Sequence, residues 1–243
     1  MDVTTSEQGS FRWGRRDLIA FAAFFIATVI FLPFIAFLIL RAFEPHLQMK
    51  NFSTSQKIVI QAAMDLLWIA FIFFLAKGLH GQPILRTLRV VKTPVGTIVR
   101  FAIAGILLGL LIALLSMFLP VSARSVVEGT ASLALVVLFG GVLGPILEEI
   151  VFRGFVFKVV EDAYDASLAV PVTTLLFAGL HLSQLGGSWA AFVVILILGY
   201  LLTVVRKRTG SLIPSIIMHT AYNSTILGLG ALATMLGRAG RVS

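Results

Sequence analysis

Long apolar runs dominate this chain and constrain its fold more than any other feature. A helix needs about 20 apolar residues to cross a bilayer core of about 30 Å, and most of the runs reach or approach that length. The runs are Leu18–Leu40, Ile58–Ala76, Phe101–Pro120, Leu133–Leu147, Leu168–Leu182, Trp189–Val205 and Ser211–Leu236. Only 12% of the residues are charged, about half the share of a soluble domain. The sequence therefore predicts an all-α fold, a polytopic membrane helical bundle of seven to eight transmembrane helices.

The basic residues between the runs indicate how the chain is oriented. Lys and Arg collect on the cytoplasmic side of membrane proteins, and three arginines precede the first run. We therefore expect a cytoplasmic N-terminus, which places the basic segments at 77–92, 153–158 and 206–208 on the same side. The basic loop at 41–57 is an exception. The side of the C-terminus stays open, because seven spans would place it outside and eight inside.

Residues 1–96 are expected to form an N-terminal tail, a two-span hairpin and a basic cytoplasmic segment. Residues 97–243 would form a helical core, and the two parts together one membrane domain. The segment 78–96 is rich in Gly, Pro, Arg and Lys, which favours a long loop or an interfacial helix.

Composition excludes several classes of function. The net charge of +8 is explained by basic cytoplasmic loops, and no segment is long enough for a soluble nucleic-acid-binding domain. The chain has no cysteine, which excludes disulfides, thiol catalysis and thiolate metal sites. The expected partner is the lipid bilayer. Compact size and the lack of a targeting signal favour a bacterial inner membrane.

Ionisable residues inside membrane spans are costly and mark functional sites. Counted from the expected cytoplasmic ends of their helices, Glu148 and His181 lie about 20 Å deep, at 1.5 Å per residue. On the last helix His219 lies about 12 Å deep and Asn223 about 18 Å. Three separate helices thus bring polar side chains to similar depths, which indicates a shared site.

Helical geometry separates the roles of these side chains. Glu149 and Arg153 are i,i+4 neighbours and can pair, whereas Glu148 is rotated by about 100° and is free to face another cavity. The set fits activation of a water molecule, with a carboxylate base, a histidine that orients the water and donors for an oxyanion. The alternative is that His181, His219 and Asn223 only join neighbouring helices. Asp65, one turn after Gln61, is interpreted as such an interhelical contact.

Three short motifs then connect the chain to a known family. Glu148 to Arg153 matches EExxxR, Phe177 to His181 matches FxxxH, and His219 to Asn223 matches HxxxN. In this order the motifs resemble the CPBP family of intramembrane endopeptidases, which includes CAAX proteases and bacteriocin-processing enzymes. The resemblance covers about residues 131–227.

The resemblance implies an eight-helix fold with a membrane-embedded site open to the cytosol. It implies that Glu148 is the general base and that His181 helps to activate the attacking water. His219 and Asn223 would hold the oxyanion, and Arg153 would steady Glu149. Phe177 belongs to the supporting residues, with Glu149 and Arg153.

The expected function is hydrolysis of a peptide bond in a membrane-tethered peptide, including a prenylated CAAX protein, or in a very hydrophobic one. Gly140, Gly141 and Gly144 would give such a chain room. No metal is expected, although two histidines and a glutamate could also bind zinc. Against zinc, the spacing is not HExxH and Asn223 is a poor zinc ligand. The alternatives are a non-proteolytic scaffold or bacteriocin-immunity protein, and a transporter that uses Glu148 as a proton carrier.

Overall fold

The computed structural model describes residues 11–118, 134–182, 185 and 187–239. Every regular element among these residues is helical, and they contain no strand. This confirms the predicted all-α fold.

Long apolar helices make up most of the described chain. Four of them are long and apolar enough to cross a membrane: Arg15–Phe43, Thr54–Leu79, Val95–Ser116 and Trp189–Thr209. They correspond to α1 (Arg15–Phe43), α2 (Thr54–Phe73) with its π-helical extension η2 (Phe74–Leu79), α4 (Val95–Ser116) and α9 (Trp189–Thr209). The chain is therefore an integral membrane protein by the length and composition of its helices.

The remaining helices carry the three motifs. One continuous helical run consists of η3 (Val136–Leu143), α6 (Gly144–Glu149), η4 (Ile150–Val156) and α7 (Phe157–Ala163). It is followed by α8 (Ala166–His181) and, after α9, by α10 (Ile213–Ala239). Short helices η1 (Met49–Asn51) and α3 (Ile84–Thr87) lie in the connections. Most of the segment 78–96 is thus a connection with one short helix, and its two ends belong to η2 and α4.

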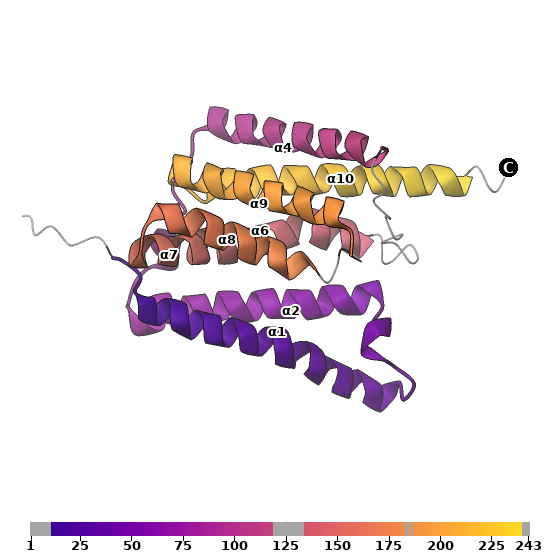
Figure 1. Ribbon diagram of the computed structural model, residues 1–243, viewed down its shortest axis with the longest axis horizontal. Coiled ribbons are helices and arrows are strands. Elements are labelled where there is room, and N and C mark those ends of the chain that lie inside the picture. The colour runs from indigo at the N-terminus through magenta and orange to yellow at the C-terminus, as the bar shows by residue number, and fades with distance from the viewer. Residues whose placement is uncertain (1–10, 119–133, 183–184, 186, 240–243) are drawn as a thin grey trace, which may run out of the picture.

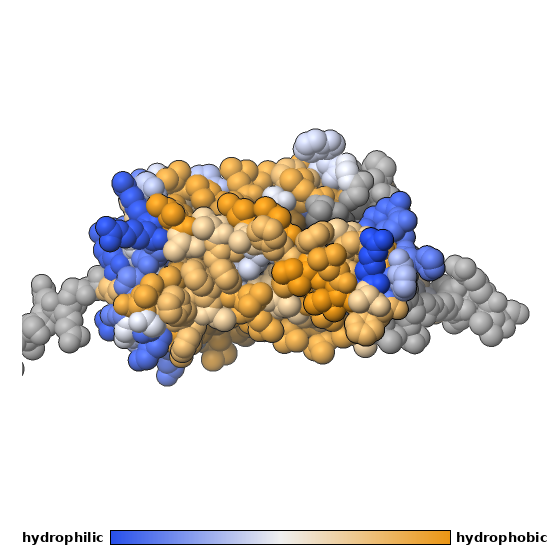
Figure 2. Space-filling view, turned by 90° about the horizontal axis from the view of Figure 1, so that it is seen from below, coloured by the Kyte–Doolittle hydropathy of each residue, from blue (hydrophilic) through white to orange (hydrophobic). Residues whose placement is uncertain are grey.

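The long helices lie side by side along the longest axis of the molecule (Figure 1). The hairpin of α1 and α2 forms one side, α4 and α10 form the opposite side, and α6 to α9 lie between them. The face seen in Figure 2 has an apolar middle with hydrophilic side chains gathered towards both ends. This pattern is the one expected for a bundle whose middle lies in lipid.

Close backbone packing joins α4 to α10. A Cβ atom added at Gly105 would lie 2.3 Å from the backbone oxygen of Met218, and one at Gly109 would lie 2.8 Å from Cβ of Thr225. Small residues allow membrane helices to approach in this way. The helix that carries His219 is therefore fixed from its outer side.

Aromatic packing joins the N-terminal hairpin to the motif-bearing helices. Within the hairpin, the indole nitrogen of Trp68 donates to the hydroxyl of Thr28 at 2.6 Å. The rings of Trp13 and Phe21 then contact Phe155 of η4, with centroids 4.9 and 4.7 Å apart. The helix that carries the two glutamates is thereby held against the hairpin.

Candidate active site

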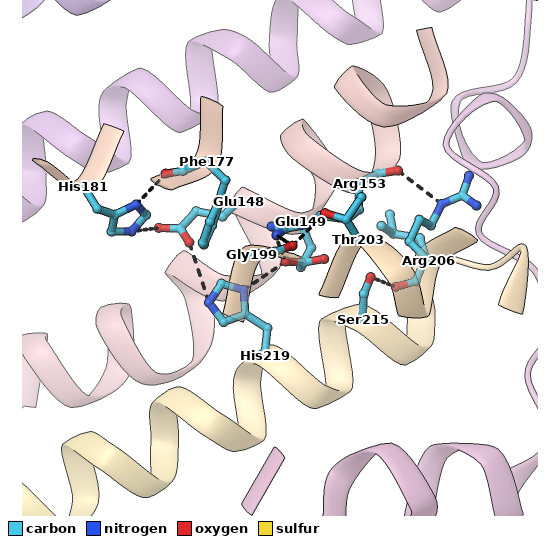
Figure 3. A network of polar contacts seen from close by, with 11 residues as sticks. Glu148, Glu149, Arg153, Phe177, His181, Gly199, Thr203, Arg206, Ser215 and His219 are labelled. Atoms are coloured by element: carbon cyan, nitrogen blue, oxygen red, sulfur yellow. Dashed lines mark hydrogen bonds and ion pairs between the residues drawn. The ribbon is translucent and has the colours of Figure 1, made fainter. Parts of the chain in front are cut away.

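The acidic motif lies where α6 passes into the π-helical turns of η4. Glu149 is the last residue of α6, and Arg153 lies in the middle of η4. π-Helical turns inside longer helices are frequent at functional sites. His181 is the last residue of α8, and His219 lies in the second turn of α10. Three helical elements thus bring their polar side chains together (Figure 3).

Glu149 and Arg153 form a fully buried ion pair. Nη1 of Arg153 donates to Oε1 of Glu149 at 2.8 Å, and both side chains have no exposed surface. Nδ1 of His219 also lies 3.0 Å from Oε1 of Glu149. The other carboxylate oxygen, Oε2, has no hydrogen-bond partner among the described residues. The predicted i,i+4 pair is therefore present, with a histidine as its third member.

The guanidinium of Arg153 is held mainly by α9. Nη2 donates to the backbone oxygen of Gly199 at 2.9 Å, and Nε donates to the hydroxyl of Thr203 at 3.3 Å. The ring of Phe177 lies under the guanidinium, 4.3 Å from centroid to Cζ. A buried charge is tolerated only where such partners surround it. These contacts fix the position of Arg153 and, through it, of Glu149.

Glu148 lies between two histidines, and among the described residues it has no direct hydrogen bond. Its Oε1 lies 3.9 Å from Nε2 of His181, and its Oε2 lies 3.8 Å from Nε2 of His219. Both distances exceed the range of a hydrogen bond. The side chains of Glu148 and His181 are 19% and 20% exposed, so this part of the cluster is more open than the ion pair beside it.

The partners of the two imidazoles orient both rings towards Glu148. Nδ1 of His181 lies 2.8 Å from the backbone oxygen of Phe177. A carbonyl only accepts, so Nδ1 of His181 carries a hydrogen and Nε2 of the neutral ring can accept. Nδ1 of His219 donates in the same way to Glu149, whose carboxylate is paired with Arg153. Each ring thus uses Nδ1 for support and presents Nε2 to Glu148.

Phe177 connects the two halves of the cluster. Its ring packs edge-on against Phe152 with centroids 5.4 Å apart, and its centroid lies 4.8 Å from that of His181. Its backbone oxygen fixes the His181 ring, as described above. The first residue of the FxxxH motif therefore positions a histidine and covers the guanidinium of Arg153.

Asn223 does not join this network in the described structure. Nδ2 of Asn223 donates to the backbone oxygen of Gly140 at 2.9 Å, and the hydroxyl of Ser224 donates to Gly141 at 3.0 Å. A Cβ atom at Gly140 would lie 3.0 Å from the side chain of Leu227. These glycines therefore serve the packing of η3 on α10. The expectation that Gly140 and Gly141 leave room for a peptide is wrong for the described conformation.

Three residues that support the cluster were not predicted from the sequence. They are Gly199, Thr203 and Arg206, spaced i, i+4 and i+7 on α9, and Arg206 donates from Nε to the backbone oxygen of Arg153 at 3.1 Å. We expected Arg206 in a basic segment on the cytoplasmic side, and the structure buries its side chain, which is 2% exposed. The helical spacing of small and polar residues was the signal that could have found this face.

The arrangement can be compared with that of a zinc site. Within the part of the chain that the structure describes, no group of three or more His, Asp or Glu side chains is placed to hold a metal ion. Nε2 of two histidines and a carboxylate are nonetheless zinc-ligand types, each histidine with a supporting acceptor at Nδ1.

The fold and the cluster define a helical membrane protein with glutamates and histidines gathered between its helices. Residues 130–225 match the family described as type II CAAX prenyl endopeptidase, Rce1-like. The match includes all three motifs, and it supports a CAAX protease of the CPBP family. No curated protein and no solved structure matches the chain.

Proposed function

We propose that the protein is an intramembrane endopeptidase in which Glu148 activates the attacking water. The observation that carries this proposal is the placement of Glu148, which faces two imidazole nitrogens at 3.8 and 3.9 Å without a direct hydrogen bond. A general base is a proton-accepting group that lies within reach of the attacking water and of the substrate. The neighbouring glutamate is committed to Arg153 and His219 and cannot serve.

The proposed reaction uses Glu148 first as a base and then as an acid. A water molecule between Glu148 and His181 would donate one hydrogen to the carboxylate and one to Nε2 of the imidazole. As the water oxygen attacks the peptide carbonyl carbon, its proton passes to Glu148. The proton then passes to the nitrogen of the departing amine, and the carbon–nitrogen bond breaks.

His219 and Asn223 are proposed to stabilise the oxyanion. For His219 this role requires the imidazolium form, which would donate from Nδ1 to Glu149 and from Nε2 to the oxyanion. Asn223 uses one amide hydrogen on Gly140, and an amide nitrogen carries two, so a second remains for the oxyanion. Removal of one such donor typically lowers the rate by about 10²–10³-fold.

The proposed substrate is a membrane-tethered peptide, such as a prenylated CAAX protein, or a very hydrophobic one. This rests on the family of residues 130–225 and on the position of the cluster between long apolar helices. We further propose seven membrane crossings, because each of the seven apolar runs contains a helix. The end of the molecule where α1 begins would then face the cytosol, and the site would open towards it.

The proposal is tested by comparing the termini of membrane proteins in cells that carry the wild type or Glu148→Gln at matched expression. Glu44→Gln is the matched control, because Glu44 is exposed at the end of α1. A terminus found with wild type and Glu44→Gln, and lost with Glu148→Gln, would support proteolysis and identify the substrate. If no terminus differs under several growth conditions, a non-proteolytic scaffold or immunity protein becomes the better explanation.

We propose that this chemistry needs no metal, with zinc as the alternative. The test is the zinc content of the purified protein together with activity before and after a strong chelator. Activity that persists in metal-free protein supports water activation by Glu148 without a metal ion. Stoichiometric zinc, with activity lost on chelation and restored by zinc, would replace it with a zinc-bound water.

A further inference from the structure

A second polar site lies outside the glutamate and histidine cluster, at the end of the molecule where α1 begins. It is a cavity of about 440 Å³ between the residues that precede α1, the segment around α3 and the last turns of α7. None of the motif residues lines it. Figure 1 shows the start of α1 and α7 at the same end of the bundle, and hydrophilic side chains gather at this end in Figure 2.

Cationic side chains outnumber anionic ones around this cavity. The cationic residues are Arg12, Arg86, Arg89 and Lys158, and the anionic ones are Glu161 and Asp162. Lys158 pairs with both carboxylates, and Nη2 of Arg12 donates to the backbone oxygen of Asp162 at 2.7 Å. The two carboxylates are therefore already engaged by part of the basic set.

Arg86 and Arg89 keep their guanidinium groups free. Among the described residues, neither side chain has an ion pair or a hydrogen bond, and both are exposed at the cavity. Two guanidiniums three residues apart, both lining one cavity, form a ready anion-binding pair. No contact among the described residues neutralises either charge.

The backbone holds Arg89 in an unusual conformation. Its φ is 59°, in the left-handed region that residues with a Cβ atom seldom adopt. The turn is fixed because Arg89 donates from its N–H to Arg86 at 3.1 Å and accepts from the N–H of Leu212 at 3.0 Å. Backbone strain of this kind is concentrated at functional sites. The strained turn places both arginines at the cavity.

One of the lining residues, Trp13, also carries a buried donor without a partner among the described residues. Trp13 is 2% exposed, and its Nε1 has no hydrogen-bond partner among the described residues. The indole is held by edge-on contacts with Phe11 and Phe155. A buried N–H group without an acceptor is costly. A ligand with several acceptor oxygens would satisfy it.

We propose that this cavity binds a phosphate-bearing anionic group, and that the source is the headgroup of an anionic lipid such as phosphatidylglycerol. Arginine pairs bind phosphate oxygens through parallel charge-assisted hydrogen bonds. Basic pockets between membrane helices at the level of the headgroups bind anionic lipids. The volume suits a small headgroup better than a bare phosphate ion. This inference is independent of the proposed peptidase activity and requires only that this end of the bundle lies at a membrane surface.

The test uses the purified full-length protein in a neutral detergent. Thermal unfolding is followed while short-chain phosphatidylglycerol, short-chain phosphatidylcholine, glycerol 3-phosphate or inorganic phosphate is added. The variant is Arg86→Gln with Arg89→Gln, and the control is Lys207→Gln with Arg208→Gln, which removes two exposed charges near the start of α10 without touching the cavity. Trp13→Phe is a second variant that keeps an aromatic ring and removes the N–H donor.

We expect phosphatidylglycerol to raise the unfolding temperature of the wild type and of the control with the same half-saturating concentration. The half-saturating concentration for the arginine variant should be at least about tenfold higher, since each basic residue near an anionic headgroup contributes to the affinity. For Trp13→Phe the half-saturating concentration should be several-fold higher than for the wild type.

The arms of the experiment separate the sources of the phosphate. Saturation by glycerol 3-phosphate or inorganic phosphate at the same concentrations would keep the phosphate site but assign it to a soluble ligand. Equal half-saturation in the arginine variant and the control would overturn the site, as would an unfolding temperature that no phosphate compound changes. In that case the arginines are ordinary basic residues on the cytoplasmic side.

Discussion

Glu148 and Glu149 are adjacent in the chain, yet they occupy opposite kinds of environment. Glu149 is fully buried and contacts Arg153 and His219 at 2.8 and 3.0 Å. Glu148 is 19% exposed and has two histidine nitrogens just beyond hydrogen-bond distance. One carboxylate is committed to structure, while the other is left available for chemistry.

The contrast fits the proposed role of Glu148 as the reactive carboxylate of this membrane helix. The ion pair of Glu149 and Arg153 fixes the rotation of the helix, because α9 holds the guanidinium and α10 holds the carboxylate. His219 lies beside both glutamates through different nitrogens, so the buried ion pair also helps to position the imidazole that faces Glu148.

Arg153→Met should cause the largest loss of stability. The substitution leaves the Glu149 charge buried without its cation, so we expect the free energy of unfolding to fall by about 3–5 kcal/mol. The measurement is thermal or denaturant unfolding in detergent. The control is Glu149→Gln with Arg153→Met, which removes both charges and should recover a large part of the loss. If Arg153→Met alone is as stable as the wild type, the ion pair does not hold the helix.

His181→Gln should affect activity rather than stability. His181 is partly exposed and is tied to its surroundings by one backbone carbonyl, so unfolding should change by less than about 1 kcal/mol. Loss of the group that orients the water should lower kcat by about 10²–10³-fold. His46→Gln, in an exposed loop, is the control for histidine loss. A stability loss comparable to that of Arg153→Met would place His181 with the structural residues.

Asn223→Ala should have a smaller effect on both properties. Loss of its hydrogen bond to Gly140 should cost about 1 kcal/mol of stability, and loss of an oxyanion donor should lower kcat by about 10²-fold. Ser224→Ala is a close control, because its hydroxyl makes the equivalent bond to Gly141. The two variants should lose similar stability, and only Asn223→Ala should lose activity. If Asn223→Ala and Ser224→Ala are equally active, Asn223 is not an oxyanion donor.

Asp65→Asn should have the smallest effect. Asp65 is buried in α2 and accepts a hydrogen bond from Gln61 at 3.0 Å, which the amide oxygen of asparagine can also accept. We expect stability within about 1 kcal/mol of the wild type and activity reduced by less than about tenfold. Unfolding and peptide cleavage measured on the same preparation check this. An activity loss as large as that of His181→Gln would add Asp65 to the site.

The sequence predicted those features that follow from helical geometry and from the cost of burying charge. The spacing of Glu149 and Arg153 predicted their contact, and the 100° rotation predicted that Glu148 would face elsewhere. The similar depths of Glu148, His181 and His219 predicted that three helices would meet there. Each of these inferences needs only the helical period and the length of an apolar run.

Other features depend on tertiary contacts that the sequence does not encode locally. Arg206 lies in a basic turn of the sequence, and only the packing of α9 on η4 shows that it is buried. The amide of Asn223 shares a helix face with His219, yet its Nδ2 donates to Gly140 because η3 lies close to α10. The strained turn at Arg89 likewise depends on a hydrogen bond from Leu212, 123 residues away in the sequence.

The most direct test compares Glu148→Gln with Glu149→Gln in one preparation series, measuring peptide cleavage and thermal unfolding for both. We predict that Glu148→Gln lowers kcat by about 10³-fold or more and leaves the unfolding temperature close to that of the wild type. Glu149→Gln should lower stability by about 3 kcal/mol, since it leaves Arg153 buried without its anion. If instead Glu148→Gln cleaves normally, or the two variants lose stability and activity alike, the division of labour between the two glutamates is wrong.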